Sequence, residues 1–314
     1  MQSRFKAASL VVVLAAFSLT LVGCAQLNKL KAKKAFKEAN TLYQQQDFKR
    51  AADRYEEVVA NDPELTAAYF FLANSYDNLY KPSRKGEAAI DAFLKKAVEN
   101  YKKSAGVEKD KVLKTRSLQY LVAAYGPDKL DDPSQAEPLL QEMIQIDPAD
   151  PSNYAILSKM YEDAGQYELA EQTLLKAKQA IPKDPTSYTQ LAAFYNRQGE
   201  FEKTMEALSE RTAKEPSNPE GFYTIAAYYW EKAYRDFRLK DAEKLNYIAL
   251  GMEAADQALS LSPEYLDAIN RKELLIRAKA LVVKDPAQQK ALLDDAKKLR
   301  EQYNEIKQRK AGGK

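Results

Sequence analysis

Residues 151–184 read PSNYAILSKMYEDAGQYELAEQTLLKAKQAIPKD, and residues 185–218 read PTSYTQLAAFYNRQGEFEKTMEALSERTAKEPSN. Both stretches place the same kinds of residue at the same intervals, and the chain begins the pattern again at Pro219. The positions that recur at steps of 34 residues are Tyr154, Tyr188 and Phe222; Leu157, Leu191 and Ile225; Tyr161, Tyr195 and Tyr229; Pro148, Pro182 and Pro216; and Gly165 and Gly199. An internal period of this length is typical of repeat proteins, in which each repeat is one supersecondary unit.

The spacing inside one repeat predicts two helices joined by a tight turn. Tyr154, Leu157 and Tyr161 lie at i, i+3 and i+7, which is one face of a helix. Gly165 follows that helix and can adopt the left-handed conformation that ends it. Pro182 cannot continue the second helix. The whole chain agrees with this prediction, because its 314 residues include only 10 glycines and 13 prolines.

The order of these residues resembles the tetratricopeptide repeat (TPR). In that family a large residue, Leu, a small residue and Tyr mark the first helix, Gly-x-Tyr marks the turn, and Ala and Pro mark the second helix and its end. The resemblance implies an all-α fold, in which antiparallel helix pairs stack into a right-handed superhelical solenoid with a concave groove. The register covers residues 32–263 as about six TPR units. Residues 264–314 are expected to form C-terminal capping helices and a polar tail.

Several segments depart from the repeat. The second repeat carries the insertion DNLYKPSRKG (77–86), and the third has GPDKLDDPSQ (126–135) in its turn. The sixth repeat is longer than the others, because 47 residues separate Pro216 from Pro263. In the fifth repeat Thr204 and Arg211 stand where small Ala is usual. This predicts either looser packing or an arginine stem that extends outward to solvent.

The N-terminus predicts a lipoprotein signal peptide, residues 1–23, that is removed from the mature protein. A short basic start precedes the uncharged stretch AASLVVVLAAFSLTLV at residues 7–22. As a helix that stretch would span about 24 Å, less than the bilayer core of about 30 Å. A cleaved export signal is therefore favoured over an uncleaved signal anchor, which is the alternative.

The segment Leu21-Val22-Gly23-Cys24 resembles the lipobox of bacterial lipoproteins. The resemblance implies that Cys24, the only cysteine in the chain, carries the lipid, including an acyl chain such as palmitate, and anchors the protein in a membrane. Residues 24–31 are then the lipidated cysteine and a tether. Because Ala25 rather than Asp follows the cysteine, the resemblance implies the outer membrane, with the protein facing the periplasm.

The composition argues against most catalytic and nucleic-acid-binding functions. The chain has no histidine and one cysteine, so it lacks His-dependent nucleophiles, His-ligated zinc and an internal disulfide. Its formal net charge is only +3, whereas a nucleic-acid-binding protein usually has a strongly basic face. No Gly-rich phosphate loop occurs. We expect a protein that is not an enzyme, holds no cofactor or metal, and does not bind nucleic acid.

In TPR proteins the first helix of each repeat lines the groove, so the resemblance implies a protein or peptide partner there. The groove positions in this chain are Phe36, Asn40, Tyr43, Phe70, Asn74, Asn78, Gln119, Lys159, Asn196, Arg197, Tyr223 and Trp230. Asparagine amides can pair with an extended backbone, and aromatic rings provide contact area at low entropy cost. One TPR subclass clamps a terminal carboxylate with Lys and Arg, but Phe36 stands in place of its first Lys.

A second aromatic stripe follows in the widened repeat. Tyr223, Ala227, Trp230, Tyr234 and Phe237 lie at i, i+4, i+7, i+11 and i+14, beside the stripe expected in the core. One interpretation is a docking surface for a partner. The other is that the longer second helix covers the stripe, because aromatic stripes at helical spacing are usually core.

These features together predict a membrane-anchored TPR scaffold that binds protein or peptide partners in the cell envelope, in envelope assembly, secretion or pilus-type adaptor work. The alternative is a periplasmic carrier, whose groove or widened sixth repeat holds a small apolar or carbohydrate ligand. The sequence does not determine the oligomeric state.

Overall fold

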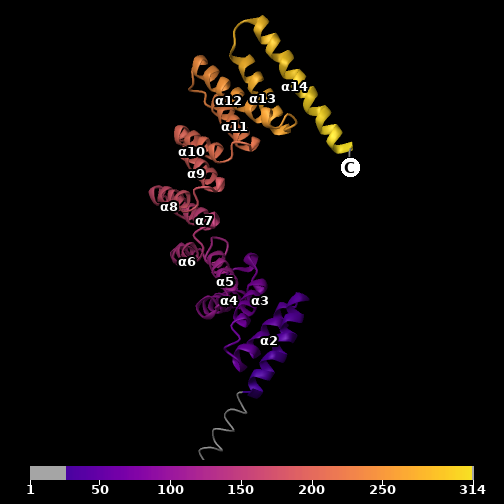
Figure 1. The fold of residues 1–314 in the computed structure, drawn as a ribbon. Helices are drawn as coiled ribbons and strands as arrows, with labels where there is room; N and C mark the ends of the chain where they lie inside the picture. Colours follow the sequence, from indigo (N-terminus) through magenta and orange to yellow (C-terminus); the bar gives the residue numbers. More distant parts are fainter. Residues whose placement is uncertain (1–25, 313–314) are drawn as a thin grey trace, which may run out of the picture. The chain divides into compact units, whose positions relative to one another are not determined.

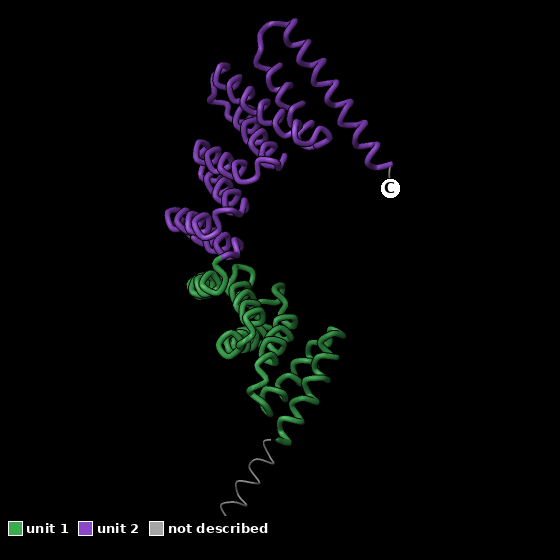
Figure 2. The backbone as a smooth tube through the Cα atoms, viewed as in Figure 1, with its two compact units in different colours: residues 1–148 green, residues 149–314 purple. Residues whose placement is uncertain are grey.

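The computed structural model describes residues 26–312, which divide between Pro148 and Ala149 into two compact units (Figures 1 and 2). Every regular element within the described residues is helical. The predicted all-α fold is therefore confirmed. The predicted signal peptide and the lipid attachment point Cys24 lie outside the described residues.

The first unit is built of consecutive helices that pack against one another in chain order. A helix over 26–44 comes first. It is followed by α2 (Phe48–Asn61), α3 (Ala67–Leu79), the short 3₁₀ helix η1 (Pro82–Arg84), α4 (Ala88–Val107), α5 (Lys111–Ala124) and α6 (Pro133–Ile146). Tyr55 on α2 and Tyr101 on α4 are fully buried in this unit, so its core contains large polar-tipped rings as well as aliphatic side chains.

The second unit continues the same arrangement of helix hairpins. Its elements are α7 (Pro151–Asp163), α8 (Tyr167–Ala180), α9 (Pro185–Arg197), α10 (Phe201–Lys214), α11 (Pro219–Arg235), α12 (Asp241–Leu261), α13 (Leu266–Val282) and α14 (Pro286–Gly312). The first helices of neighbouring hairpins, such as α11 and α13, also contact each other. In this unit the first helices α7, α9 and α11 carry Lys159, Asn196, Arg197, Tyr223 and Trp230, which the sequence places in the groove.

Repeated local chemistry sets the helix ends in this unit. The side chains of Asp150, Asp184 and Asn218 each accept a backbone N–H two residues later, at 2.9, 2.9 and 3.0 Å. Each cap is followed by proline at the first helical position, where its fixed φ suits the helix and no N–H is needed. Gly165 and Gly199 have φ of 73° and 76° in the turns, which confirms the predicted left-handed conformation.

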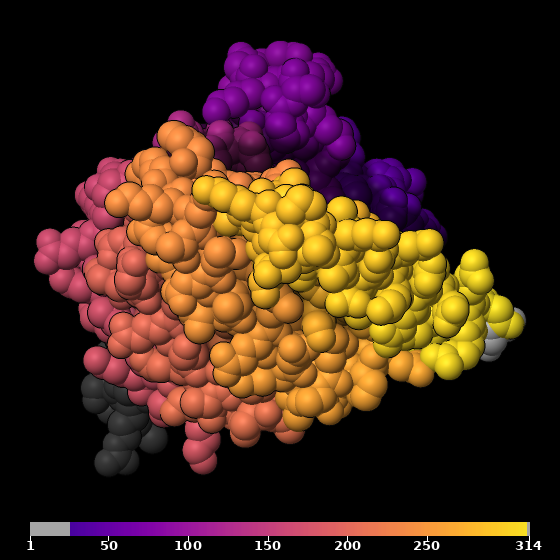
Figure 3. All heavy atoms as spheres, turned by 90° about the horizontal axis from the view of Figure 1, so that it is seen from above, coloured from indigo at the N-terminus to yellow at the C-terminus, as the bar shows by residue number. Residues whose placement is uncertain are grey.

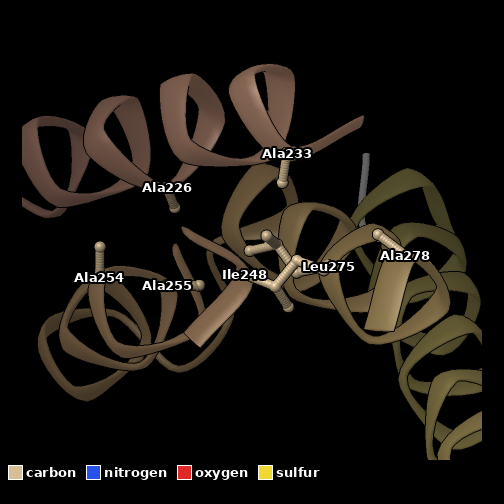
Figure 4. Close-up of a cluster of buried hydrophobic side chains, with 7 residues drawn as sticks. All are labelled: Ala226, Ala233, Ile248, Ala254, Ala255, Leu275 and Ala278. Carbon is tan, nitrogen blue, oxygen red and sulfur yellow. The ribbon is translucent and has the colours of Figure 1, made fainter. Parts of the chain in front are cut away.

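The widened sixth repeat is filled by longer helices. Helix α11 has 17 residues and α12 has 21, whereas α7 to α10 have 13 or 14. Figure 4 shows small side chains of α11 and α12 meeting aliphatic side chains of α12 and α13, in the cluster Ala226, Ala233, Ile248, Ala254, Ala255, Leu275 and Ala278. Small residues let the three backbones approach closely. A Cβ built on Gly251 of α12 would lie only 2.8 Å from Leu275 Cδ2.

Arg211 on α10 does not extend to solvent. The residue is only 7% exposed, and its guanidinium group donates to Glu220 Oε1 at 3.1 Å and to Thr224 Oγ1 at 3.4 Å, both on α11. The predicted outward stem is therefore wrong. The physical reason is that α11 supplies a carboxylate and a hydroxyl group, which accept hydrogen bonds from the buried guanidinium group.

The last helix covers one end of the second unit. Helix α14 packs against α13, and Figure 3 shows it as an outer layer over the preceding helices of this unit. The two helices are joined by Glu273 of α13, whose carboxylate is 1% exposed and receives hydrogen bonds from Arg277 and, at 2.6 Å, from Arg300 Nη2 of α14. Within residues 26–312, no helix has both the length and the apolar character of a membrane span.

Candidate partner-binding surfaces

The second unit carries an aromatic surface on its first helices α11 and α13, which we call the Trp230 surface: Tyr223, Trp230, Tyr234 and Arg271. Trp230 stacks on Tyr234 with ring centres 5.1 Å apart and an interplanar angle of 9°. From α13, the guanidinium carbon of Arg271 lies 4.7 Å from the Trp230 ring centre and 5.9 Å from that of Tyr223. The surface thus combines a cation with three aromatic rings.

The guanidinium group of Arg271 lacks partners for its donors. Its Nε is buried without a hydrogen-bond acceptor, and no carboxylate of the described residues pairs with it. A guanidinium group has five N–H donors in a fixed fork that matches a carboxylate. The buried Nε is closed to a partner, but the two Nη groups of Arg271 donate to no described residue, so the Trp230 surface offers these donors beside aromatic contact area.

The structure divides the predicted aromatic stripe. Tyr223 and Trp230 are half-buried, and Trp230 also packs against the core cluster of Figure 4. Tyr234 is 59% exposed and Phe237 is 88% exposed. Tyr223 and Trp230 are therefore held in part by packing within the unit, whereas the exposed rings of Tyr234 and Phe237 can still contact a partner. Partner binding by these residues stays a prediction.

A hollow of about 490 Å³ lies beside the exposed end of this stripe. It contains two predicted residues from different repeats, Asn196 and Phe237, together with Phe201 and Tyr228, which sequence analysis did not single out. The charges around it are largely neutralised within the unit. The Asp236 carboxylate, for example, accepts from Arg238 and Lys232 at 2.9 and 3.1 Å, and these hydrogen bonds hold the pKa of Asp236 well below its usual range.

Arg197, another predicted groove residue, is engaged by its own chain. Its Nε and Nη2 each donate to the Glu162 carboxylate at 2.8 Å, which joins the ends of α9 and α7. The hydrogen bonds from Arg197 lower the pKa of Glu162 below its ordinary value of 4.5. The guanidinium group of Arg197 therefore links two adjacent repeats. A partner would have to displace Glu162 to use it.

In the first unit, predicted groove residues form an internal hydrogen-bond network. Tyr43 Oη donates to Asn74 Oδ1 at 2.6 Å, Asn74 Nδ2 donates to Tyr101 Oη at 3.1 Å, and Asn78 Nδ2 donates to Asn74 Oδ1 at 2.9 Å. Asn74 is buried by its neighbours, whereas Asn78 is exposed. Asn74 therefore has no free amide group for a partner in this arrangement.

Three other predicted residues of the first unit, Asn40, Phe36 and Phe70, also contact its core, whereas Gln119 is exposed. Asn40 Oδ1 accepts from Tyr55 Oη at 2.6 Å. Phe36 meets the Tyr55 ring edge-to-face, with centres 5.9 Å apart. Phe70 is buried against the rings of Tyr101 and Tyr120, which stack on each other. The burial of Phe70 and the half-burial of Phe36 and Asn40 make this part of the predicted groove a structural core more than an open surface.

The described residues contain no group of three or more Cys, Asp or Glu side chains placed to hold a metal ion.

Comparison with known proteins identifies the repeat. The family model described as tetratricopeptide repeat matches residues 129–193. Among solved structures, the C-terminal part of a TPR repeat-containing protein from Cytophaga hutchinsonii is similar over 84% of this chain and 95% of its own length, with 16% sequence identity and a TM-score of 0.54.

Two further structures are similar at lower TM-scores. YrrB, described as a TPR protein with an unusual peptide-binding site, is 15% identical over 76% of this chain and 90% of its own, with a TM-score of 0.30. PilW, a type IV pilus biogenesis factor, is 16% identical over 76% of this chain and 96% of its own, with a TM-score of 0.39. No curated protein matches this chain in sequence. The family match over residues 129–193, the 34-residue period and the helix hairpins show that this chain contains tetratricopeptide repeats and has the all-α fold of such proteins.

Proposed function

We propose that this protein is a non-catalytic interaction scaffold of the bacterial cell envelope, which binds segments of partner proteins on the first helices of its repeats. The observation that carries the proposal is the unpaired Arg271 beside Trp230 and Tyr223. Aromatic residues and arginine are the residue types that dominate binding energy at protein interfaces. The absence of histidine from the sequence and its lone cysteine support a non-catalytic role.

The chemistry of the Trp230 surface favours an acidic partner segment with an apolar or aromatic side chain. A carboxylate of such a segment would accept hydrogen bonds from the terminal Nη groups of Arg271, and its apolar group would lie on the exposed Tyr234 ring. The half-buried Trp230 holds Tyr234 by stacking, so the surface is largely preformed and a partner orders few side chains on binding.

We further propose that a lipid on Cys24 holds the scaffold at the outer membrane, facing the periplasm. The support for this step is the sequence: a basic start, an uncharged stretch and a single cysteine after Leu-Val-Gly. In this arrangement the repeats would lie close to envelope proteins. Metabolic labelling with a palmitate analogue should tag the parent chain and not a Cys24→Ser variant. An unlabelled parent chain would contradict the lipid anchor without affecting the binding surface.

The binding surface is tested by tryptophan fluorescence, because Trp230 is the only tryptophan in the chain. The probes are two pools of decapeptides that contain random aromatic and aliphatic residues and are enriched either in Asp and Glu or in Lys. We expect the acidic pool to shift the Trp230 emission. The substitution Arg271→Gln should weaken this binding by about tenfold or more, the loss expected when a charged hydrogen-bond partner is removed.

The matched control is Tyr167→Ala, which removes an exposed aromatic ring from α8 of the same unit. This variant should bind the acidic pool as the parent does, whereas Tyr234→Ala should bind it more weakly. Equal responses to the acidic and basic pools, or unchanged binding by Arg271→Gln, would show that the Trp230 surface does not recognise acidic segments.

A further inference from the structure

The helix over residues 26–44 has two faces of opposite character. Its inner face packs into the first unit through small side chains: Ala32, Ala35 and Ala39 are 0%, 3% and 0% exposed. A helix turns by about 100° per residue, so the opposite side is set by sequence spacing. That side carries the exposed residues Leu27, Leu30, Lys31, Lys34 and Lys37, which we call the outer face.

Two leucines lie at the beginning of the outer face. Leu27 is 54% exposed and Leu30 is 58% exposed. They are three residues apart on the helix, so their side chains are neighbours and form one apolar patch. Exposed apolar surface gains free energy when it leaves water. The start of the outer face therefore favours an environment that can take up apolar side chains.

Lysines that lack acidic partners continue the outer face. Lys31 and Lys37 form no ion pair with any residue in the described part of the chain. Lys34 has Glu38 at 4.0 Å, and that carboxylate is also 3.4 Å from Arg54 Nε, which shares its charge. The outer face therefore presents positive charge directly after its leucines.

The sequence around the outer face contains no opposing charge. Residues 27–37 include five lysines and no acidic residue. Of these lysines, Lys29 is paired with Glu64 at 2.8 Å, to one side of the outer face. The combination of exposed leucines with unpaired lysines is typical of helices that lie in the interface of a bilayer with anionic lipids.

The chain places the outer face next to the predicted lipid attachment point. The helix begins at residue 26, inside the segment predicted as a tether. Leu27 follows Cys24 by three residues, so their Cα atoms are at most about 11 Å apart in any conformation. Lys31 is four residues further along the helix, which adds about 6 Å. A lipid on Cys24 would therefore hold both residues close to the bilayer surface.

We propose that the outer face lies on an anionic phospholipid surface. This inference rests on the proposed lipid at Cys24 and adds a second contact to it. Leu27 and Leu30 enter the boundary between head groups and acyl chains, and the lysines pair with lipid phosphates. The alkyl stems of the lysines cover apolar surface while their ammonium groups stay in the polar layer.

The contact would orient the first unit at the membrane. On the side of the helix away from the outer face, Phe36 contacts the rings of Tyr55 on α2 and Phe71 on α3. These two helices would therefore lie on the side of the first helix that faces away from the lipid. A second copy of the chain is a poorer occupant of the outer face, because pairing two such faces would bring lysines of like charge together.

The test measures whether the outer face contacts lipid. Leu30→Trp in a Trp230→Phe background places the only tryptophan of the full chain on this face. The protein is reconstituted in vesicles of phosphatidylcholine, with or without phosphatidylglycerol, that contain brominated lipid, which quenches tryptophan on contact. We expect strong quenching and blue-shifted emission with phosphatidylglycerol, and weaker quenching without it. Added salt should reduce the difference, because it screens the lysines.

Lysine variants of this tryptophan protein locate the charge. Replacing Lys31, Lys34 and Lys37 by Gln should shift the contact equilibrium on phosphatidylglycerol vesicles toward the free state by about tenfold or more. The matched control replaces three other exposed lysines of the same unit that have no ion pair, and it should keep the original quenching. These are Lys95, Lys109 and Lys111. Thermal melts verify that each variant is folded.

Three results would overturn the proposal. Equal quenching in the two kinds of vesicle would mean that anionic lipid does not attract the outer face. Equal quenching in the two lysine variants would mean that its lysines make no specific contact. The absence of quenching in both vesicles would leave the outer face in water.

Palmitate labelling separates this contact from the lipid anchor. A labelled chain without quenching contradicts only the contact of the outer face. Quenching of an unlabelled chain supports that contact and contradicts only the lipid on Cys24. Neither result bears on peptide binding at Trp230.

Discussion

The guanidinium carbon of Arg271 lies 4.7 Å from the centre of the Trp230 ring and bridges α13 to α11. The two residues come from consecutive hairpins, and only one of them belongs to a segment with a recognisable repeat pattern. The pair joins a half-buried ring to a cation whose Nε has no acceptor. It therefore contributes to the stability of the second unit and also defines its candidate binding surface.

The contact can be tested directly by removing the cation. Arg271→Ala should lower the free energy of unfolding by about 1 kcal/mol, because it removes the cation–π contact and the packing of the arginine stem. It should also raise acrylamide quenching of Trp230 by uncovering one face of the ring. Arg309→Ala, at an exposed position of α14, is the control and should leave quenching unchanged. If quenching is the same in all three proteins, Arg271 does not cover the ring in solution.

The bidentate ion pair between Arg197 and Glu162 predicts a pH-dependent contribution to stability. In the folded state Arg197 lowers the pKa of Glu162 below its ordinary value of 4.5. The stabilisation is therefore present above that value and is lost as the pH falls through the lower folded pKa. Near pH 7, Glu162→Gln should reduce the free energy of unfolding by about 1 kcal/mol, a modest value because the Arg197 side chain is 46% exposed and solvent screens the pair.

Urea denaturation at a series of pH values measures this difference between parent and variant. It should shrink as the solution is acidified. In an Arg197→Gln background the Glu162→Gln substitution should have a smaller effect at neutral pH and almost no dependence on pH. A difference that stays constant down to low pH would show that the ion pair does not form in solution.

The buried carboxylate of Glu273 should control the attachment of α14. Glu273→Ala leaves Arg277 and Arg300 without their shared acceptor, at a cost of about 2 kcal/mol, because both guanidinium groups can still reach water. Amide hydrogen exchange in α14 should accelerate more than in α7 to α10. The exposed pair Arg309–Glu264 provides a control, since Glu264→Gln should cost less than about 1 kcal/mol. Equal exchange rates in the parent and Glu273→Ala would mean that apolar packing alone holds α14.

Gly251 is expected to be required at its position inside a helix. A Cβ there would lie 2.8 Å from Leu275 Cδ2 and 3.1 Å from Tyr229 Cβ. Gly251→Ala gains about 1 kcal/mol of helix propensity, but overpacking costs about 1–3 kcal/mol, so we expect a net loss of stability.

Gly106 on α4 is the comparison for this prediction, because a Cβ there meets nothing within 4 Å. Gly106→Ala should be neutral or stabilising by a few tenths of a kcal/mol, as its place near the helix end reduces the propensity gain. Replacing Leu275 by Val should rescue part of the loss in Gly251→Ala. A more stable Gly251→Ala protein would mean that α12 and α13 are packed less closely than described.

The prediction of the fold from sequence succeeded where the physical cause was local. The turn glycines Gly165 and Gly199 do adopt positive φ, and α8 and α10 end shortly before Pro182 and Pro216. Each of these features depends on the conformational preference of one residue and its near neighbours. The 34-residue period repeats such local signals, so the helix hairpins could be predicted without any tertiary information.

The site was harder to predict because it depends on neighbours distant in the chain. Asn74 has the spacing of a groove residue, yet Tyr43 and Tyr101 engage its amide from the flanking helices. Looser packing or an outward stem were the two expectations for Arg211, but Glu220 of the next helix holds its guanidinium group inside. Arg271 carries no repeat signature, and only its position against Trp230 gives it a candidate role.

By itself, the sequence determined that this protein is a series of α-helical hairpins of one repeat family, because helix faces, caps and turns are set by residues a few positions apart. It also supplied the reasons to expect a lipid on Cys24. Only the tertiary structure decided which polar groups find partners: Arg197 and Asn74 do, whereas the Arg271 Nε and the Tyr80 hydroxyl group do not. Hydrogen bonding and burial depend on which atoms lie close together in space, and the spacing of residues along the chain does not specify this.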